Sequence, residues 1–192
     1  MEYPKSKKVG DIGEDEILKK ILPKYPKAFI DDIGKANSKW DIYIPEIGEG
    51  IEVKIDFKSN YSHNILIETE FDGRPSALSL TEAKYWVIIT GYRYIWITPL
   101  QIYRFLELHP YFGRVFLTGK GDNVAKIAHL PTQEKFLQYV RKLEKKDGWV
   151  DMIEENEILY YKRFSKSGSA EDIDEDSVYD ENVILDVLNI KT

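Results

Sequence analysis

The chain has 192 residues, of which 43% are hydrophobic and 13% aromatic, so it is long enough to bury the core of one folded domain. It has no cysteine, which excludes disulfides, thiolate zinc sites, iron–sulfur clusters and a cysteine nucleophile. No apolar run reaches the roughly 18 residues that a membrane span needs, and no apolar signal core follows Met1. We therefore expect no membrane partner and a cytoplasmic location, which is the host cytoplasm if the source is viral.

The net charge of −6 is unevenly distributed along the chain. Beyond Gly168 there are eight acidic residues and one lysine, which leaves 25 acidic and 26 basic residues before it and a charge there of about +1. The acidic total therefore does not exclude DNA as a partner. We expect residues 1–164 to form the folded domain and residues 165–192 to form an acidic, flexible tail.

The first half of the chain predicts a helix followed by strands. Residues 14–22 combine an apolar stripe with acidic residues at the start and lysines at the end, and a proline follows. A short strand is expected at 28–30, and two further strands at 40–44 and 50–57 flank a turn-rich segment typical of a hairpin. Another strand is expected at 64–70. Residues 79–84 predict a short helix, because Ser79 is followed by Glu82 in the spacing of a capping box.

The second half begins with a continuously apolar segment, residues 85–90, which is typical of a buried central strand. A strand at 93–98 and a helix from Pro99 to about Leu108 follow. Two short strands, 115–117 and 124–128, predict a second hairpin, and an amphipathic helix with a basic outer face begins near Pro131. These elements predict an α/β (α+β) fold with a mixed central sheet flanked by helices.

Charged residues alternate with apolar ones along the first predicted hairpin. Glu52, Lys54 and Asp56 fall on one face of their strand, and pairing of the apolar faces brings Asp41 beside them. Two neighbouring carboxylates repel each other unless a cation lies between them, and Mg²⁺ or Mn²⁺ suits a site of oxygen ligands that also binds a phosphate. The same alternation is typical of a solvated sheet face, so both interpretations stay open.

Other charged residues are candidates for the same site. Glu14 adds a carboxylate if the first helix packs over the polar face, and Glu68 and Glu70 extend the site if they share a strand face. Phosphate contacts are assigned to Lys35 and Lys84. His63, a short way beyond the Glu52 strand, is a candidate general base, although a lone loop histidine is more often simply exposed.

A resemblance to the PD-(D/E)XK nuclease superfamily rests on three segments between Lys7 and Thr98: Gly13-Glu14-Asp15-Glu16, Trp40-Asp41-Ile42 and Glu52-Val53-Lys54. The nearest members are archaeal resolvase-like and viral ones. The resemblance implies a restriction-endonuclease-like αβββαβ core. It also implies that Asp41, Glu52 and the Val53 carbonyl bind the metal, that Lys54 is the catalytic lysine and that Glu14 is an accessory acid. Trp40 stands where the motif has its proline.

We therefore expect a Mg²⁺-dependent deoxyribonuclease, with branched or junction DNA of replication, recombination or repair as a candidate substrate. The metal would lower the pKa of a bound water, and Lys54 would stabilise charge on the phosphate. No organic cofactor is expected, and a homodimer is expected because cutting two strands calls for paired sites. Two alternatives stay open: an inactive nuclease fold that binds DNA or a protein, and an unrelated α+β interaction module whose charged face points into solvent.

Overall fold

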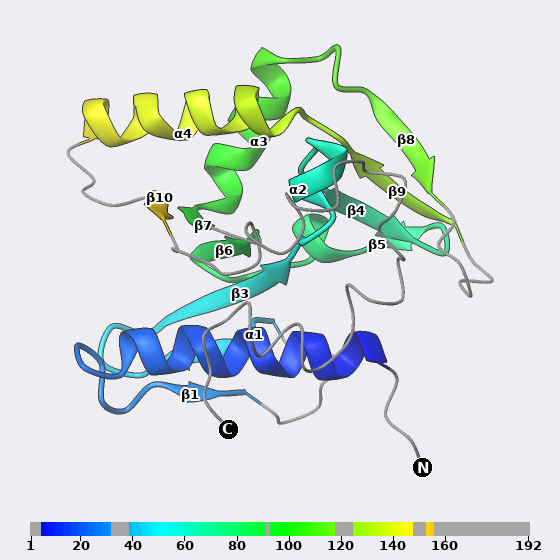
Figure 1. Ribbon diagram of the computed structural model, residues 1–192. Coiled ribbons are helices and arrows are strands. Elements are labelled where there is room, and N and C mark those ends of the chain that lie inside the picture. The colour runs from blue at the N-terminus through cyan, green and yellow to red at the C-terminus, as the bar shows by residue number, and fades with distance from the viewer. Residues whose placement is uncertain (1–4, 32–38, 91–92, 118–124, 148–152, 156–192) are drawn as a thin grey trace, which may run out of the picture.

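The computed structural model describes residues 5–31, 39–90, 93–117, 125–147 and 153–155. Within these ranges the chain forms a mixed α/β fold with a six-stranded sheet, order β1-β2-β3-β6-β7-β10, and a four-stranded sheet, order β5-β4-β9-β8 (Figure 1). The elements are, in chain order, α1 (Lys5–Ile21), β1 (Phe29–Ile30), β2 (Ile42–Ile44), β3 (Glu49–Ile55), α2 (Ser59–Ser62), β4 (Ile67–Phe71), β5 (Arg74–Pro75), the 3₁₀ turn η1 (Ala77–Ser79), β6 (Tyr85–Ile89), β7 (Arg93–Ile97), α3 (Pro99–Leu108), β8 (Arg114–Leu117), β9 (Lys126–His129), α4 (Gln133–Asp147) and β10 (Ile153–Glu155).

The six-stranded sheet is mixed, and β3 lies where its strand directions change. β2 and β3 form the predicted antiparallel hairpin, with Ile42 opposite Ile51. β3 then runs parallel to β6, with Lys54 level with Ile88, and β6 pairs antiparallel with β7. The connection from β3 to β6 passes through α2, β4, β5 and η1, as a parallel pairing requires a long crossover. β6 is the buried central strand that its apolar sequence predicted.

One face of this sheet is covered by α1, which lies along it in Figure 1. Val9, Ile17 and Ile21 recur at helical spacing and pack with the apolar side chains of β2, β3 and β6. The approach is closest at Gly13, where an added Cβ atom would lie 2.4 Å from Ile55 Cδ1. α1 therefore packs on the Ile51, Val53 and Ile55 face of β3.

The other face is covered by α3 and α4 (Figure 1). Trp86 and Ile88 of β6 point to this side and are buried with Phe105 of α3 and Phe136 of α4. Because Glu52 and Lys54 are level with Trp86 and Ile88 in the parallel register, their side chains share this face. The predicted site residues of β3 thus lie on the opposite side of the sheet from α1.

Most of the predicted elements are confirmed, including both hairpins and the central strand. The first helix is longer than predicted: it begins at Lys5 rather than near Glu14. The helix from Pro99 to Leu108 has the predicted bounds, because the Thr98 hydroxyl caps the Gln101 N–H and the Gln101 side chain caps the Thr98 N–H in return.

The helix predicted over residues 79–84 is wrong. The structure has only the turn Ala77–Ser79 there, followed by irregular, non-helical backbone. The Lys84 N–H donates to the Gly50 carbonyl at 2.9 Å, and the Glu82 N–H donates to the segment before β2 at 3.2 Å. Because these N–H groups bond across to the hairpin, they do not close a helical turn. Tertiary hydrogen bonds outweigh the local capping pattern.

The prediction that Glu68 and Glu70 share a strand face is also wrong. A β-bulge in β4 places Glu68 opposite Ala128 and Glu70 opposite Ile127, and these neighbours on β9 point to opposite faces. Glu70 forms an ion pair with Arg114 of β8 instead. Glu68 lies near enough to Lys54 for its charge to help raise the pKa of that lysine.

Some predictions concern residues outside the described ranges: the phosphate contact of Lys35, the turn at 118–123 and the acidic segment 165–192. Among the helices within those ranges, none has the length and apolar character needed to cross a membrane.

Candidate active site

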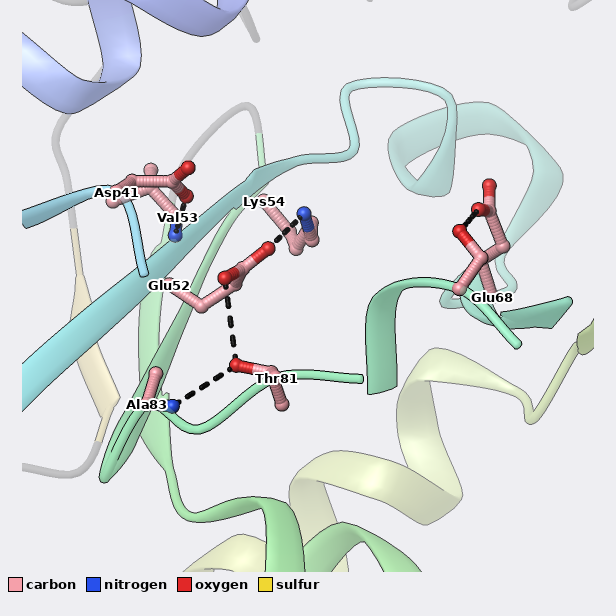
Figure 2. A network of polar contacts seen from close by, with 8 residues as sticks. Asp41, Glu52, Val53, Lys54, Glu68, Thr81 and Ala83 are labelled. Atoms are coloured by element: carbon pink, nitrogen blue, oxygen red, sulfur yellow. Dashed lines mark hydrogen bonds and ion pairs between the residues drawn. The ribbon is translucent and has the colours of Figure 1, made fainter. Parts of the chain in front are cut away.

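Asp41 lies just before β2, where the hairpin holds it against β3. Its Oδ2 atom accepts a hydrogen bond from the Val53 N–H at 2.7 Å, and its own N–H donates to the Ile51 carbonyl at 2.9 Å (Figure 2). These two bonds fix the carboxylate beside the backbone between Glu52 and Lys54. The prediction that Asp41 lies next to this strand is confirmed.

Trp40 packs the chain just before Asp41 onto the hairpin. Its ring stacks on Tyr43, with the ring centroids 5.1 Å apart, and lies directly over Gly50. A Cβ atom at Gly50 would come within 2.6 Å of the indole ring, so glycine is required for this close approach. Trp40 thus has a packing role at the position where the resemblance expects a proline.

Glu52 and Lys54 form an ion pair on the face of β3 that looks toward α3 and α4. Lys54 Nζ donates to Glu52 Oε1 at 2.5 Å, and Thr81 Oγ1 lies 3.4 Å from Glu52 Oε2 (Figure 2). The Glu52 side chain is 12% exposed and the Lys54 side chain 36% exposed. The Glu52 side chain is therefore enclosed and the Lys54 side chain is only partly exposed, which differs from an ordinary solvated strand face.

The charges of these residues shift one another's pKa. Burial raises the pKa of Glu52; the Lys54 charge opposes this shift and the Asp41 charge adds to it. Burial alone would lower the pKa of Lys54, but the charges of Glu52 and Asp41, the hydrogen bond to Glu52 and the charge of Glu68 raise it overall. Lys54 therefore stays an ammonium group at neutral pH, so it supplies a fixed positive charge rather than a general base.

Thr81 is a site residue that sequence reasoning missed. Its hydroxyl lies between the Glu52 carboxylate, to which it donates, and the Ala83 N–H, from which it accepts at 3.2 Å (Figure 2). The sequence pattern placed Thr81 in a helix, and its residue type gives no sign of a partner on β3. Its role follows from the non-helical backbone after η1, which tertiary hydrogen bonds stabilise.

The condition under which Glu14 was expected to join the site, a first helix packed over the polar face of the strand, is not met. Glu14 belongs to α1, and α1 packs on the face of β3 opposite Glu52 and Lys54. The described part of the chain contains no group of three or more His, Asp or Glu side chains arranged to hold a metal ion. The structure thus joins Asp41, Glu52 and Lys54 and leaves the accessory role of Glu14 as a prediction.

The remaining lysines near the site have partners on the surface. Lys84 Nζ lies 3.3 Å from Glu49 Oε1, and Lys39 Nζ lies 2.6 Å from Glu82 Oε2. Both lysine side chains are at least half exposed, and exposed pairs of this kind contribute about 0–1 kcal/mol. Either lysine can therefore exchange its carboxylate partner for a phosphate at little cost.

Asp56, on the same strand face in the sequence, has a structural role. Its carboxylate accepts hydrogen bonds from the Ser59 N–H at 3.2 Å and the Leu66 N–H at 2.8 Å, which ties α2 to the segment before β4. Burial raises the pKa of this carboxyl group, and the two backbone hydrogen bonds oppose the shift.

His63 ends α2 in the left-handed region, with φ 57°, and lines a separate pocket.

The residues present fit a divalent cation bound by two carboxylates. Asp41 and Glu52 supply hard oxygen ligands, and the Val53 carbonyl belongs to the residue between Glu52 and Lys54. Mg²⁺ commonly takes one or two protein carboxylates and completes its coordination with water and substrate phosphates. A third carboxylate is therefore not required for a metal to bind here.

Comparisons with protein-family models, with curated proteins and with solved structures give no match to this chain. Any function assigned to it therefore rests on the geometry of the site and on the residues that carry the resemblance.

Proposed function

We propose that the protein is a metal-dependent nuclease that hydrolyses DNA phosphodiester bonds. The observation that carries the proposal is the grouping of Asp41, Glu52 and Lys54 around β3, with the Lys54 ammonium group 2.5 Å from an enclosed carboxylate. Two neighbouring carboxylates favour a bound cation, and a fixed positive charge beside that cation favours a phosphate. This combination suits metal-assisted hydrolysis of a phosphodiester.

The order of the elements supports a restriction-endonuclease-like core. α1 is followed by the antiparallel strands β1, β2 and β3, and β6 then pairs parallel with β3. This order agrees with the αβββαβ core that the resemblance implies, except at the second helix. In its place the chain has α2, the hairpin of β4 and β5, and η1.

Each residue would have a separate part in hydrolysis. Asp41, Glu52 and the Val53 carbonyl would hold Mg²⁺ or Mn²⁺, which when bound supplies a water of lowered pKa and neutralises phosphate charge. Lys54 stabilises the negative charge that develops on the phosphate oxygens. Thr81 orients Glu52 from its second oxygen, so the carboxylate is held in one position before substrate binds.

DNA as the partner and a homodimer as the cutting unit belong to the same proposal. Cutting both strands of a duplex at related positions requires two sites of opposite orientation, which a two-fold dimer provides. Branched or junction DNA is a candidate substrate for the same reason.

A second candidate is a nuclease fold that binds DNA or a protein without cutting. One observation favours it: among the described residues, Asp41 and Glu52 are not joined by a third acidic or histidine ligand. Under this alternative the site binds no metal, and neutralising Asp41 changes no activity.

The experiment that separates the two candidates uses labelled duplex, single-stranded and four-way-junction DNA, together with RNA, in Mg²⁺, Mn²⁺ or EDTA. Cleavage of any of the DNA substrates that requires the metal supports the nuclease. Glu52→Gln purified in parallel reveals contaminating nucleases, because its own cleavage should be lost. Absence of cleavage on every substrate, with no Mn²⁺ binding by calorimetry, supports the inactive fold.

A further inference from the structure

A second polar site lies beyond the ends of β3 and β6. It is a pocket of about 610 Å³ between the His63 segment, the start of β7 and the outer side of α4. Arg93 reaches it from β7 and Arg141 from α4. None of Asp41, Glu52 and Lys54 lines it, so the pocket is distinct from the candidate active site.

The lining of this pocket suits an anion. The described residues that line it include two arginines and His63 and a single acid, Glu134, whose Oε1 atom already accepts a hydrogen bond from Gln138 at 2.9 Å. Leu137 is the one apolar side chain among the described residues that line the pocket. Such a lining favours a small charged group over an apolar ligand.

Arg141 is open to a ligand. It is exposed and makes no hydrogen bond or ion pair with the described part of the chain. Arg93 has contacts within the fold, and the register of β10 places Glu155 opposite it. A guanidinium group presents a rigid fork of donors that matches two phosphate oxygens, so Arg141 would be the principal contact.

The pocket and Lys54 lie on the same face of the six-stranded sheet. Lys54 is level with Ile88, which is level with Ile95 on β7, and Arg93 precedes Ile95 by two residues. Side chains two residues apart on a strand share a face. Arg93 lies two strands away from Lys54 across the sheet and two residues away along the strand direction. These spacings place the two Cα atoms about 12 Å apart. A short stretch of one nucleic-acid strand can span this distance.

We propose that the pocket is a phosphate subsite for the DNA strand that binds at Asp41, Glu52 and Lys54. Arg141 and Arg93 would hold a phosphate of the same strand a short distance from the scissile one. The inference rests on the proposed function, because that function supplies the strand. It adds a positioning site whose contribution is to binding and register rather than to the chemical step.

The test is binding of fluorescently labelled single-stranded and duplex DNA, measured by anisotropy in EDTA so that no cleavage occurs. Arg141→Gln should weaken binding roughly five-fold and lower the slope of log affinity against log salt by about 0.7 to 0.9. The matched control is Lys142→Gln, which removes the same charge from the next exposed residue of α4, outside the lining. It should change the affinity less than two-fold. Glu134→Gln, which removes the acid of the pocket, should tighten binding.

Equal effects of Arg141→Gln and Lys142→Gln, or no effect of either, would overturn the subsite. A loss of inorganic phosphate binding in Arg141→Gln, with DNA binding unchanged, would mean that the pocket takes a free anion instead of the strand. Cleavage assays with the same proteins keep the two proposals apart. If the wild type binds DNA through Arg141 but cuts no substrate, the phosphate subsite is supported and the nuclease function is contradicted. If Arg141→Gln binds and cuts DNA as the wild type does, the nuclease function is supported and the subsite is contradicted.

Discussion

The Lys54 ammonium lies 2.5 Å from Glu52 Oε1, and both side chains project from the same face of β3. Thr81 contacts the other carboxylate oxygen, so Glu52 is held from two sides while Lys54 keeps part of its surface open. Charges fixed in place before a ligand arrives need no reorganisation when it binds, which is the main physical requirement of electrostatic catalysis.

Replacing Lys54 by methionine should reduce DNA cleavage by about 10²–10³-fold, because the phosphate loses its nearest fixed positive charge. DNA binding should change only a few-fold, since one contact among several is lost. Single-turnover cleavage and anisotropy measure the two effects separately. Lys135→Met, an exposed position on α4, is the matched control and should behave as wild type. Wild-type cleavage by Lys54→Met would rule out the assigned role of this lysine.

Asp41→Asn and Asp41→Ala should separate the structural role of Asp41 from its chemical role. Asparagine keeps an oxygen that accepts from the Val53 N–H, so the free energy of unfolding should stay within about 1 kcal/mol of wild type. Alanine leaves that N–H without its acceptor and should cost about 1–3 kcal/mol. Both variants lack the charged ligand and should lose metal-dependent cleavage. Denaturant unfolding and cleavage assays check this, and cleavage by Asp41→Asn at the wild-type rate would contradict it.

Cleavage should depend on pH through Glu52. Burial raises the pKa of this carboxyl group, so the ionised form that binds a metal appears at higher pH than for an exposed glutamate. The cleavage rate at limiting Mg²⁺ should therefore rise with pH through a midpoint above the ordinary glutamate value. A rate that is already constant at the ordinary glutamate pKa would show that ionisation of Glu52 does not control the reaction.

Stability should show the opposite trend over the same pH window. Between the pKa of Glu52 in the unfolded chain and its higher value in the folded protein, the folded state binds more protons, so the free energy of unfolding falls as pH rises. Asp56, whose pKa is also raised by burial, contributes in the same direction. Glu52→Gln should remove its part of this slope and leave the Asp56 part. If Glu52→Gln has the same dependence of unfolding free energy on pH as the wild type across this window, the raised pKa of Glu52 is contradicted.

Two glycines should respond in opposite ways to alanine substitution. At Gly50 an added methyl group would meet the Trp40 ring at 2.6 Å, so Gly50→Ala should destabilise the protein by about 1–3 kcal/mol and displace Asp41, lowering cleavage. At Gly10 nothing lies within 4 Å of the new atom, and alanine suits the helix interior better, so Gly10→Ala should stabilise by about 0.5–1 kcal/mol. Thermal unfolding of both variants tests the Trp40 packing, and equal shifts would contradict it.

The hairpin and the neighbours of Lys54 could be predicted from the sequence because they depend on short-range patterns. Alternation along residues 51–57 fixes which side chains share a face, and the apolar faces of the two strands fix their pairing. Asp41 therefore lies beside Glu52 and Lys54, as expected. The buried central position of β6 also follows from its continuous apolar run.

The misplaced residues depend on contacts between distant segments. The apolar stripe of residues 14–22 predicts a helix packed on the sheet, but the face that α1 covers is set by the complementary surface of β3, and it is the face opposite Glu52. Thr81 reaches the site because backbone N–H groups bond to the hairpin instead of forming a helix. The bulge that turns Glu70 away from Glu68 has no residue signature in the strand.

The central claim is that Glu52 belongs to the chemistry of a nuclease, and a comparison within one strand tests it most directly. Cleavage of labelled DNA in Mg²⁺ and in Mn²⁺ would be measured for wild type, Glu52→Gln and Glu49→Gln. The two substitutions make the same chemical change on β3, but Glu49 pairs with Lys84 at the surface. We predict a loss of at least about 10²-fold for Glu52→Gln and less than two-fold for Glu49→Gln. Equal rates for the two variants, or no metal-dependent cleavage by wild type, would contradict the assignment.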